Sequence, residues 1–123
     1  MSQYQEELRN IMLPILQRQD ELLLELGELN IKRDELYIAN AELKDHWMQI
    51  CELTGIREEK LACLAQRRSL GFDIMRVNHL INMRRLELRQ LRSQRKILAQ
   101  PYHDKMHELV VKYPKGTLPL VSN

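Results

Sequence analysis

The chain has 123 residues, a formal net charge of +2, 44% hydrophobic residues and 29% charged residues. This length allows one domain at most. Leucine dominates the hydrophobic part, with one Phe and one Trp, which is typical of helical seams rather than of a globular core filled by aromatic side chains. No apolar run approaches the roughly 18 residues needed to cross a bilayer, so we expect no membrane insertion.

A seven-residue apolar ladder predicts a coiled-coil helix over residues 8–53. No proline interrupts the sequence between Ile15 and Gln100. Taken as heptad position d, the ladder consists of Leu8, Ile15, Leu22, Leu29, Leu36, Leu43 and Ile50. The a positions are mixed and consist of Met12, Gln19, Leu26, Arg33, Asn40 and Trp47. We expect the apolar members of both sets to form a helix–helix interface.

Two of the polar a positions, Arg33 and Asn40, are candidates for a layer that sets the register of the coil. Polar residues at a lower stability and commonly fix register or partner choice. The alternative is that the helix is simply hydrated at these two levels.

Gly55 marks a break between two helices. The first ladder would continue at residues 57 and 64, whereas the next ladder falls at 56 and 63. Because coiled coils absorb insertions of three or four residues, a one-residue slip predicts a turn at residues 54–56, where glycine ends the first helix. Glu58 and Glu59 suit the first turn of the second helix, where the helix dipole favours acids.

A second ladder predicts a helix over residues 56–99. Its d positions are Leu70, Val77, Leu91 and Leu98, and its apolar a positions are Ile74, Ile81 and Leu88. Cys63 extends the d series backwards, Arg84 occupies a d position, and Arg67 and Arg95 fall at a. The long arginine stems can cover apolar surface while their charged ends reach water.

The uneven charge of the two halves favours an all-α antiparallel helical hairpin. Residues 1–60 hold 13 acidic and 7 basic side chains (net −6), and residues 61–123 hold 4 acidic and 12 basic ones (net +8). Folding at Gly55 pairs positions whose numbers add up to about 110, so Glu25 faces Arg85 and Asp34 faces Arg76. Exposed pairs of this kind stabilise little but select the orientation. A continuous helix with a kink at Gly55 is the alternative.

The C-terminal part, residues 101–123, is predicted to be distinct from the hairpin of residues 1–100. Pro101 closes the second helix and suits the first position of a short helix that runs from Tyr102 to Lys112. The last residues contain Pro114, Gly116 and Pro119 and indicate an extended tail, which either frays or docks on a partner.

Interaction with other helices is the function that the pattern favours. Apolar residues beside the ladders, Leu23, Leu24, Ile38 and Leu86 among them, need cover from a second copy or from helices of another protein. We therefore expect a homo-oligomer or a scaffold subunit of a larger complex. A basic stripe of Arg85, Arg89, Arg92 and Lys96 suits an acidic protein partner; the alternatives are a solvated face and nucleic-acid binding, which the lack of interleaved aromatic residues makes less suitable.

Signals for catalysis or cofactor binding are weak, and we expect neither an enzyme nor a bound cofactor. His103 and His107 have the i, i+4 spacing of zinc ligands on a helix, but no third ligand is indicated. The sequence has no glycine-rich phosphate loop, and no base flanks either cysteine. Two thiols, Cys51 and Cys63, in a chain whose N-terminus is too polar for a signal peptide predict a reducing, cytoplasmic or nuclear location.

Two resemblances are short or limited to shape. The segment Ile50-Cys-Glu-Leu-Thr-Gly-Ile56, with Glu58 and Glu59, resembles a helix end of the microtubule-bundling spindle-midzone family, in which tryptophan stands in place of Cys51. It covers about a dozen residues, so no site is transferred. The two-helix layout is also similar to the stalk proteins of type III secretion ATPases and to prefoldin subunits, which implies a stalk or adaptor role as a further alternative.

Overall fold

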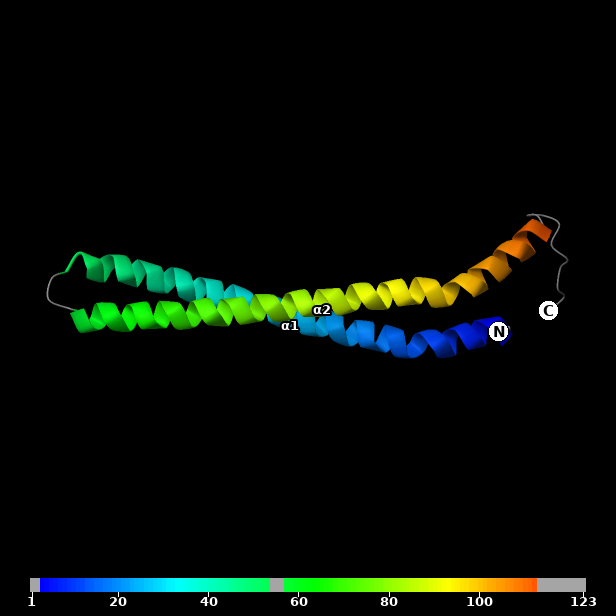
Figure 1. Ribbon diagram of the computed structural model, residues 1–123, viewed down its shortest axis with the longest axis horizontal. Helices are drawn as coiled ribbons and strands as arrows, with labels where there is room; N and C mark the ends of the chain where they lie inside the picture. Colours follow the sequence, from blue (N-terminus) through cyan, green and yellow to red (C-terminus); the bar gives the residue numbers. More distant parts are fainter. Residues whose placement is uncertain (1–2, 54–56, 113–123) are drawn as a thin grey trace. The chain divides into compact units, whose positions relative to one another are not determined.

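The computed structural model describes residues 3–53 and 57–112, and these residues form two helices and no strand. Helix α1 spans Gln3–Cys51 and helix α2 spans Arg57–Lys112, as Figure 1 shows. The all-helical prediction is confirmed, and the helices form a two-helix hairpin. Neither helix contains, within the described residues, a stretch long and apolar enough to span a membrane.

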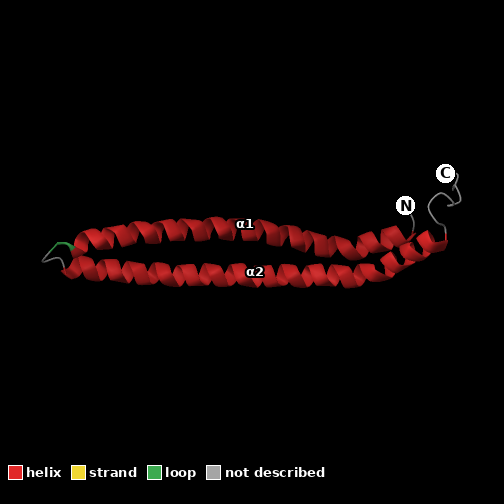
Figure 2. Cartoon of the chain, turned by 90° about the horizontal axis from the view of Figure 1, so that it is seen from above, coloured by secondary structure: helices red, strands yellow, loops and turns green. Residues whose placement is uncertain are grey.

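The contacts between the helices divide the chain into two units, each of which pairs part of α1 with part of α2. The hairpin unit comprises Glu21–Glu87, and the terminal unit comprises Met1–Asp20 together with Leu88–Asn123. In both units the paired segments run antiparallel and lie side by side (Figure 2). Each unit therefore has its own seam between two helical segments.

Cross-helix contacts establish the register of the hairpin unit. Arg84 Nε lies 2.8 Å from Glu25 Oε2, Asn78 Nδ2 donates a hydrogen bond to Tyr37 Oη at 3.3 Å, and the Cys63 thiol lies 3.8 Å from the carbonyl oxygen of Leu43. The residue numbers in these pairs add up to roughly 110, the value that the sequence predicts for a hairpin folded near Gly55.

Two of the predicted charge pairs differ in detail. Glu25 pairs with Arg84 rather than with the neighbouring Arg85, because the arginine stem at the d position reaches around the seam. Asp34 and Arg76 each have a partner on their own helix: Asp34 lies 3.6 Å from Arg33, and Arg76 lies 3.2 Å from Asp73. Asp73 and Arg76, three residues apart, are neighbours on the surface of the helix.

The end of α1 tightens before the chain turns. The backbone N–H groups of Glu52 and Leu53 donate to the carbonyls of Gln49 and Ile50 at 3.3 and 3.2 Å, the i to i+3 pattern common at a helix C-terminus. Residues 54–56 lie outside the described part of the chain, and so does the predicted role of Gly55.

The predicted boundary between the second helix and a separate C-terminal helix, at residues 99–101, is wrong. Helix α2 continues through Pro101 to Lys112. Contacts beyond the proline explain the continuation. Tyr102 Oη lies 3.5 Å from Glu7 Oε2, and its ring packs edge-to-face on Tyr4 at 6.3 Å between centroids. These contacts hold the helix to α1, while the proline removes one backbone hydrogen bond. The predicted tail, residues 113–123, lies outside the described residues.

Helix α1 likewise passes through a proline. Pro14 lies inside α1. The helix begins at Gln3, before the predicted start at residue 8. Met12 and Ile15, on either side of Pro14, are buried at 9% and 8% exposure. Their burial against α2 offsets the backbone hydrogen bond that the proline lacks.

Candidate interaction surfaces

The residues that the sequence assigns to the coiled-coil interface are buried or half-buried in both units. In the hairpin unit the most buried are Leu22, Leu26, Leu36, Ile50, Val77 and Ile81, with exposures of 0–8%; the half-buried ones are Leu29, Leu43, Trp47, Leu70 and Ile74. In the terminal unit Ile15 and Leu88 are buried, and Leu8, Leu91 and Leu98 are half-buried. All sixteen of these residues are therefore buried or half-buried.

The most buried polar layer differs from the one that the sequence singled out. Arg95 Nη1 donates a hydrogen bond to Gln19 Oε1 at 2.9 Å, and Gln19 is only 6% exposed. Arg33 and Asn40 are half-buried, and Arg33 faces Asp34 of its own helix. Both Gln19 and Arg95 occupy a positions, so a search for facing polar a positions would have identified this layer.

A second apolar line runs along α1 in the hairpin unit, outside the seam. It consists of Leu24, Ile31 and Ile38, which are 71%, 62% and 60% exposed. Because they recur every seven residues, they lie on one side of the helix, about 21 Å from first to last. We call these three residues the outer stripe. Their burial requires a surface other than α2.

A glutamate follows each member of the outer stripe four residues later. Glu28, Glu35 and Glu42 are exposed and stand one helical turn from Leu24, Ile31 and Ile38, on the neighbouring line. The sequence contains this arrangement as three consecutive heptads, LELGELN, IKRDELY and IANAELK, over residues 24–44. The d and a positions alone do not reveal this repeat, although Leu24 and Ile38 stand out in the sequence as apolar residues beside the ladder.

Gly27 lies between the first two members of the outer stripe, and its surroundings are open. A Cβ atom built on Gly27 meets no heavy atom within 4 Å. Glycine inside a helix costs roughly 1 kcal/mol relative to alanine. The chain's own packing therefore gives no reason for this residue.

Exposed apolar residues on α2 add to the surface of the hairpin unit. Leu61, Phe72 and Met75 are 55%, 64% and 67% exposed, and their spacing of 11 and 3 residues places them on one side of α2. On α1, Tyr37 is 46% exposed, and it accepts the hydrogen bond from Asn78 that joins the two helices. Apolar surface is thus present on both helices of this unit.

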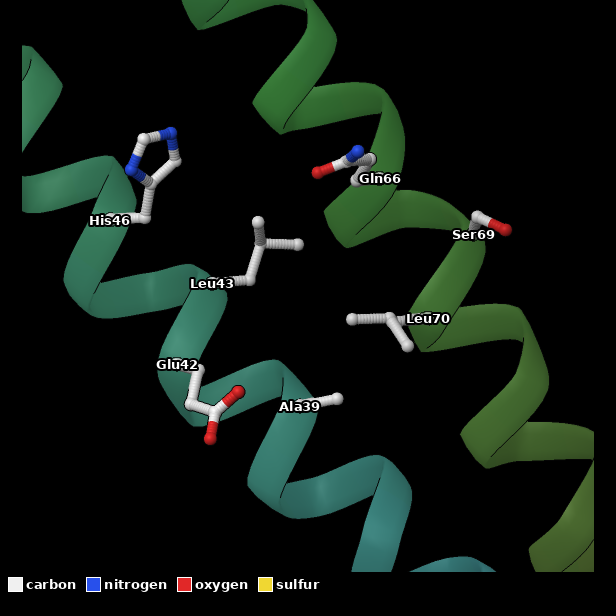
Figure 3. A pocket seen from close by; sticks show the side chains of 7 residues that line it. All are labelled: Ala39, Glu42, Leu43, His46, Gln66, Ser69 and Leu70. Carbon is white, nitrogen blue, oxygen red and sulfur yellow. The ribbon is translucent and has the colours of Figure 1, made fainter.

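A shallow groove between the helices of the hairpin unit lacks a set of side chains suited to catalysis. In Figure 3, Leu43 and Leu70 point toward each other across the gap, while Glu42 points away from it. The groove has a volume of about 410 Å³. His46 Nε2, from its lining, lies 3.6 Å from Glu59 Oε1. Leucine side chains form its centre and no nucleophile is paired with a base, so the groove suits packing rather than catalysis.

The terminal unit contains a groove of opposite charge. It has a volume of about 530 Å³ and is lined by Leu8, Met12, Leu16, Arg92, Arg95, Lys96, Ala99 and His103. None of these eight lining residues, all in the described part of the chain, is acidic. We call it the basic groove: its apolar members come mainly from α1, and its basic members come from α2. Arg92 and Lys96 of the predicted basic stripe line it, Arg89 is exposed in the same unit, and Arg85 is exposed in the hairpin unit.

Aromatic and charged groups tie the two segments of the terminal unit together beyond Pro101. Lys105 Nζ lies 5.9 Å from the centroid of the Tyr4 ring and 3.8 Å from Glu108 Oε2. Partial removal from water raises the pKa of Tyr102 above 10.0, and the negative charge and hydrogen bond of Glu7 raise it further. His103 and His107 are exposed. No group of three potential metal ligands occurs among the described residues.

Comparisons with known proteins give no assignment. No protein-family model matches the chain, and no curated protein or solved structure is significantly similar to it.

Proposed function

We propose that this protein is an assembly subunit, a coiled-coil hairpin that acts by joining helices of neighbouring protein molecules. The observation that supports the proposal is the outer stripe: Leu24, Ile31 and Ile38 are 60–71% exposed and recur at the heptad interval. A regular apolar line on the outside of a helix is the pattern of a second helix–helix contact. The seam with α2 already accounts for the first contact.

Covering this surface makes a favourable contribution to association. Complete burial of one Leu or Ile stabilises by about 1.5–3 kcal/mol, so covering the exposed part of each stripe residue contributes roughly 1–2 kcal/mol. Phe72 and Met75, at 64% and 67% exposure, enlarge the apolar area of the same unit. Surfaces of this kind are typical of interaction sites.

The proposal places the protein in a reducing compartment, the cytoplasm or nucleus, and gives it no catalytic role. Cys51 and Cys63 are free thiols, which supports such a location. The partners are further copies of the chain, helical proteins of a complex, or both. A stalk or adaptor role in a secretion or cytoskeletal machine is a special case of the same proposal.

Replacing the outer stripe by serine tests the proposal. We expect the wild-type chain to have a solution mass above the 14.7 kDa of one copy in light scattering at micromolar concentration. The triple variant Leu24→Ser, Ile31→Ser, Ile38→Ser should keep its helical circular dichroism and lose self-association. The matched control, Leu53→Ser with Met83→Ser, changes residues that are 57% and 46% exposed but lie off the stripe, and should associate like the wild type.

Partner capture completes the test for complexes with other proteins. The wild-type chain and the triple serine variant are each used to capture partners from the native host, followed by mass spectrometry. The proposal predicts helical partners that only the wild type retains. A wild-type chain that is a folded monomer and retains the same proteins as the triple variant would contradict it.

Nucleic-acid binding is the second candidate function, and the basic groove is the observation that favours it. Arg92, Arg95 and Lys96 line one groove, and each phosphate contact would make binding salt-dependent. No Phe, Tyr or Trp lines the groove, so stacking of single-stranded bases has no platform there. Binding of a labelled DNA duplex that weakens steeply with salt, and that Arg92→Glu with Lys96→Glu abolishes, would support this function.

A further inference from the structure

We propose that the outer stripe of one copy seats in the basic groove of a second copy, so that molecules join head to tail. The inference rests on the proposed assembly function and names the partner of the stripe. The two surfaces lie in different units, the stripe in the hairpin unit and the groove in the terminal unit. One copy can therefore offer both halves of the contact at once.

Apolar complementarity is the first argument. The stripe presents Leu24, Ile31 and Ile38, with 60–71% of each side chain exposed. In the groove, Leu16 is 39% exposed and is the main apolar contact that it offers, whereas Leu8 is half-buried and Met12 is buried among the lining residues. An amphipathic helix laid into an apolar groove is a common mode of helix recognition.

Charge complementarity is the second argument, and it selects this partner over an uncharged helix. Glu28, Glu35 and Glu42 flank the stripe and are exposed. Arg92 and Lys96 line the groove and are exposed. A helix whose outer stripe lies in the groove therefore places its glutamates next to the arginine and lysine side chains of the groove. None of the groove's lining residues is acidic.

The basic groove is long enough for two successive residues of the outer stripe. From Arg92 to His103 the groove follows α2 for about 16 Å, at 1.5 Å per residue. Three stripe residues span about 21 Å and two span about 10 Å by the same rise. The groove therefore accepts two successive repeats of the LELGELN–IKRDELY–IANAELK series, and the third repeat extends beyond it.

A contact between two different surfaces has a structural consequence. Unlike a two-fold interface, it leaves a free stripe at one end and a free groove at the other, so copies add until a ring closes or continue as an open chain. Because oppositely charged rims contribute, assembly should weaken as salt rises. A symmetric apolar dimer has neither property.

Charge reversal of each surface in the full-length chain tests the inference. The acid-reversed variant is Glu28→Lys, Glu35→Lys, Glu42→Lys, and the base-reversed variant is Arg92→Glu, Lys96→Glu, which keeps the Arg95–Gln19 bond. Sedimentation velocity should show at least tenfold weaker self-association for each variant alone. Mixed in equal amounts they should assemble again, because the lysines of one variant then face the glutamates of the other.

Controls separate this inference from the broader proposal. Glu52→Lys with Glu58→Lys changes two exposed acids away from the stripe and should assemble like the wild type. A monomeric wild type overturns the inference, whereas the assembly function fails as well only if the wild type and the triple serine variant also capture the same proteins. If the triple serine variant loses assembly while both charge-reversed variants keep it, the assembly function holds and the inference is overturned. A base-reversed variant that loses only binding to a DNA duplex, with unchanged assembly, also overturns it and assigns the groove to nucleic acid.

Discussion

The two units are built from the same pair of helices but differ in what holds them. The side chains that are almost fully buried, Leu22 at 0% and Ile81 at 1%, both belong to the hairpin unit. The terminal unit buries apolar residues less completely, such as Leu88 at 6%. It also buries Gln19, bonded to Arg95, and adds the contact between Tyr4 and Tyr102. Both units have an apolar seam with polar contacts across it; a buried polar residue in the seam and a contact between aromatic rings are found in the second.

The surfaces of the units differ as well. Counted over the printed sequence, residues 21–87 hold 12 acidic and 10 basic side chains (net −2), and the other residues hold 5 acidic and 9 basic ones (net +4). The hairpin unit presents glutamates beside an apolar stripe, whereas the terminal unit presents cations around an apolar groove. In the proposed assembly, the charge split between the halves of the chain serves contacts between molecules as well as hairpin formation.

The largest expected effect comes from a charge in the apolar seam. Leu36→Asp places a carboxylate where the side chain is 8% exposed, and an unpaired buried charge costs roughly 4 kcal/mol or more. We expect loss of the helical circular dichroism signal and of assembly. Ile38→Asp, two residues away and 60% exposed, should keep the helical signal and lose only assembly. Equal melting temperatures for Leu36→Asp and the wild type would refute the seam assignment.

In the terminal unit, the hydrogen bond between Arg95 and the buried Gln19 is the contact whose loss should destabilise most. Arg95→Ala leaves the buried Oε1 of Gln19 without its donor, which costs about 1–3 kcal/mol. Hydrogen exchange should speed up in residues 3–20 and 88–100. The double variant Gln19→Leu, Arg95→Ala should recover most of the loss, since replacing both partners by apolar groups removes the unsatisfied oxygen. Arg92→Ala, at an exposed site, is the control; if it has the same effect, the bond to Gln19 is not the cause.

Sequence reasoning predicted the features that depend on periodicity and missed those that depend on particular contacts. The d ladder and the pairing rule follow from local spacing, and they predicted two helices and cross-helix pairs whose residue numbers add up to about 110. The turn that the phase slip predicts lies outside the described residues. The continuation through Pro101 depends on Tyr102 meeting Glu7 and Tyr4 from the far end of the chain, which no local signal shows. The outer stripe was visible as a repeat, but its exposure is meaningful only once Leu36 and its equivalents are known to face α2.

Gly27, which lies between the first two residues of the outer stripe, provides a smaller test in which stability and self-association should change in opposite directions. Gly27→Ala should raise the free energy of unfolding by about 0.5–1 kcal/mol, because a Cβ there meets no atom of the chain within 4 Å. If a partner helix packs on the stripe, the added methyl group should weaken self-association at the same time. Gly71→Ala, at a site equally open within the chain, should stabilise α2 without weakening assembly. Unchanged or stronger association in Gly27→Ala would exclude close packing at this point.

The smallest effect concerns pH and belongs to the terminal unit alone. The pKa of Tyr102 is raised above 10.0, first by partial removal from water and then by Glu7. The folded state therefore holds this proton more tightly than the unfolded state, so its contribution to stability is fully present below pH 10 and is lost as the pH rises through the folded-state pKa. In an absorbance titration at alkaline pH, Tyr102→Phe should remove a late-ionising tyrosine, and Glu7→Gln should make that tyrosine ionise earlier. If Glu7→Gln leaves the titration unchanged, the carboxylate does not hold this end of α2 to α1, and the aromatic contact with Tyr4 alone explains why the helix continues past Pro101.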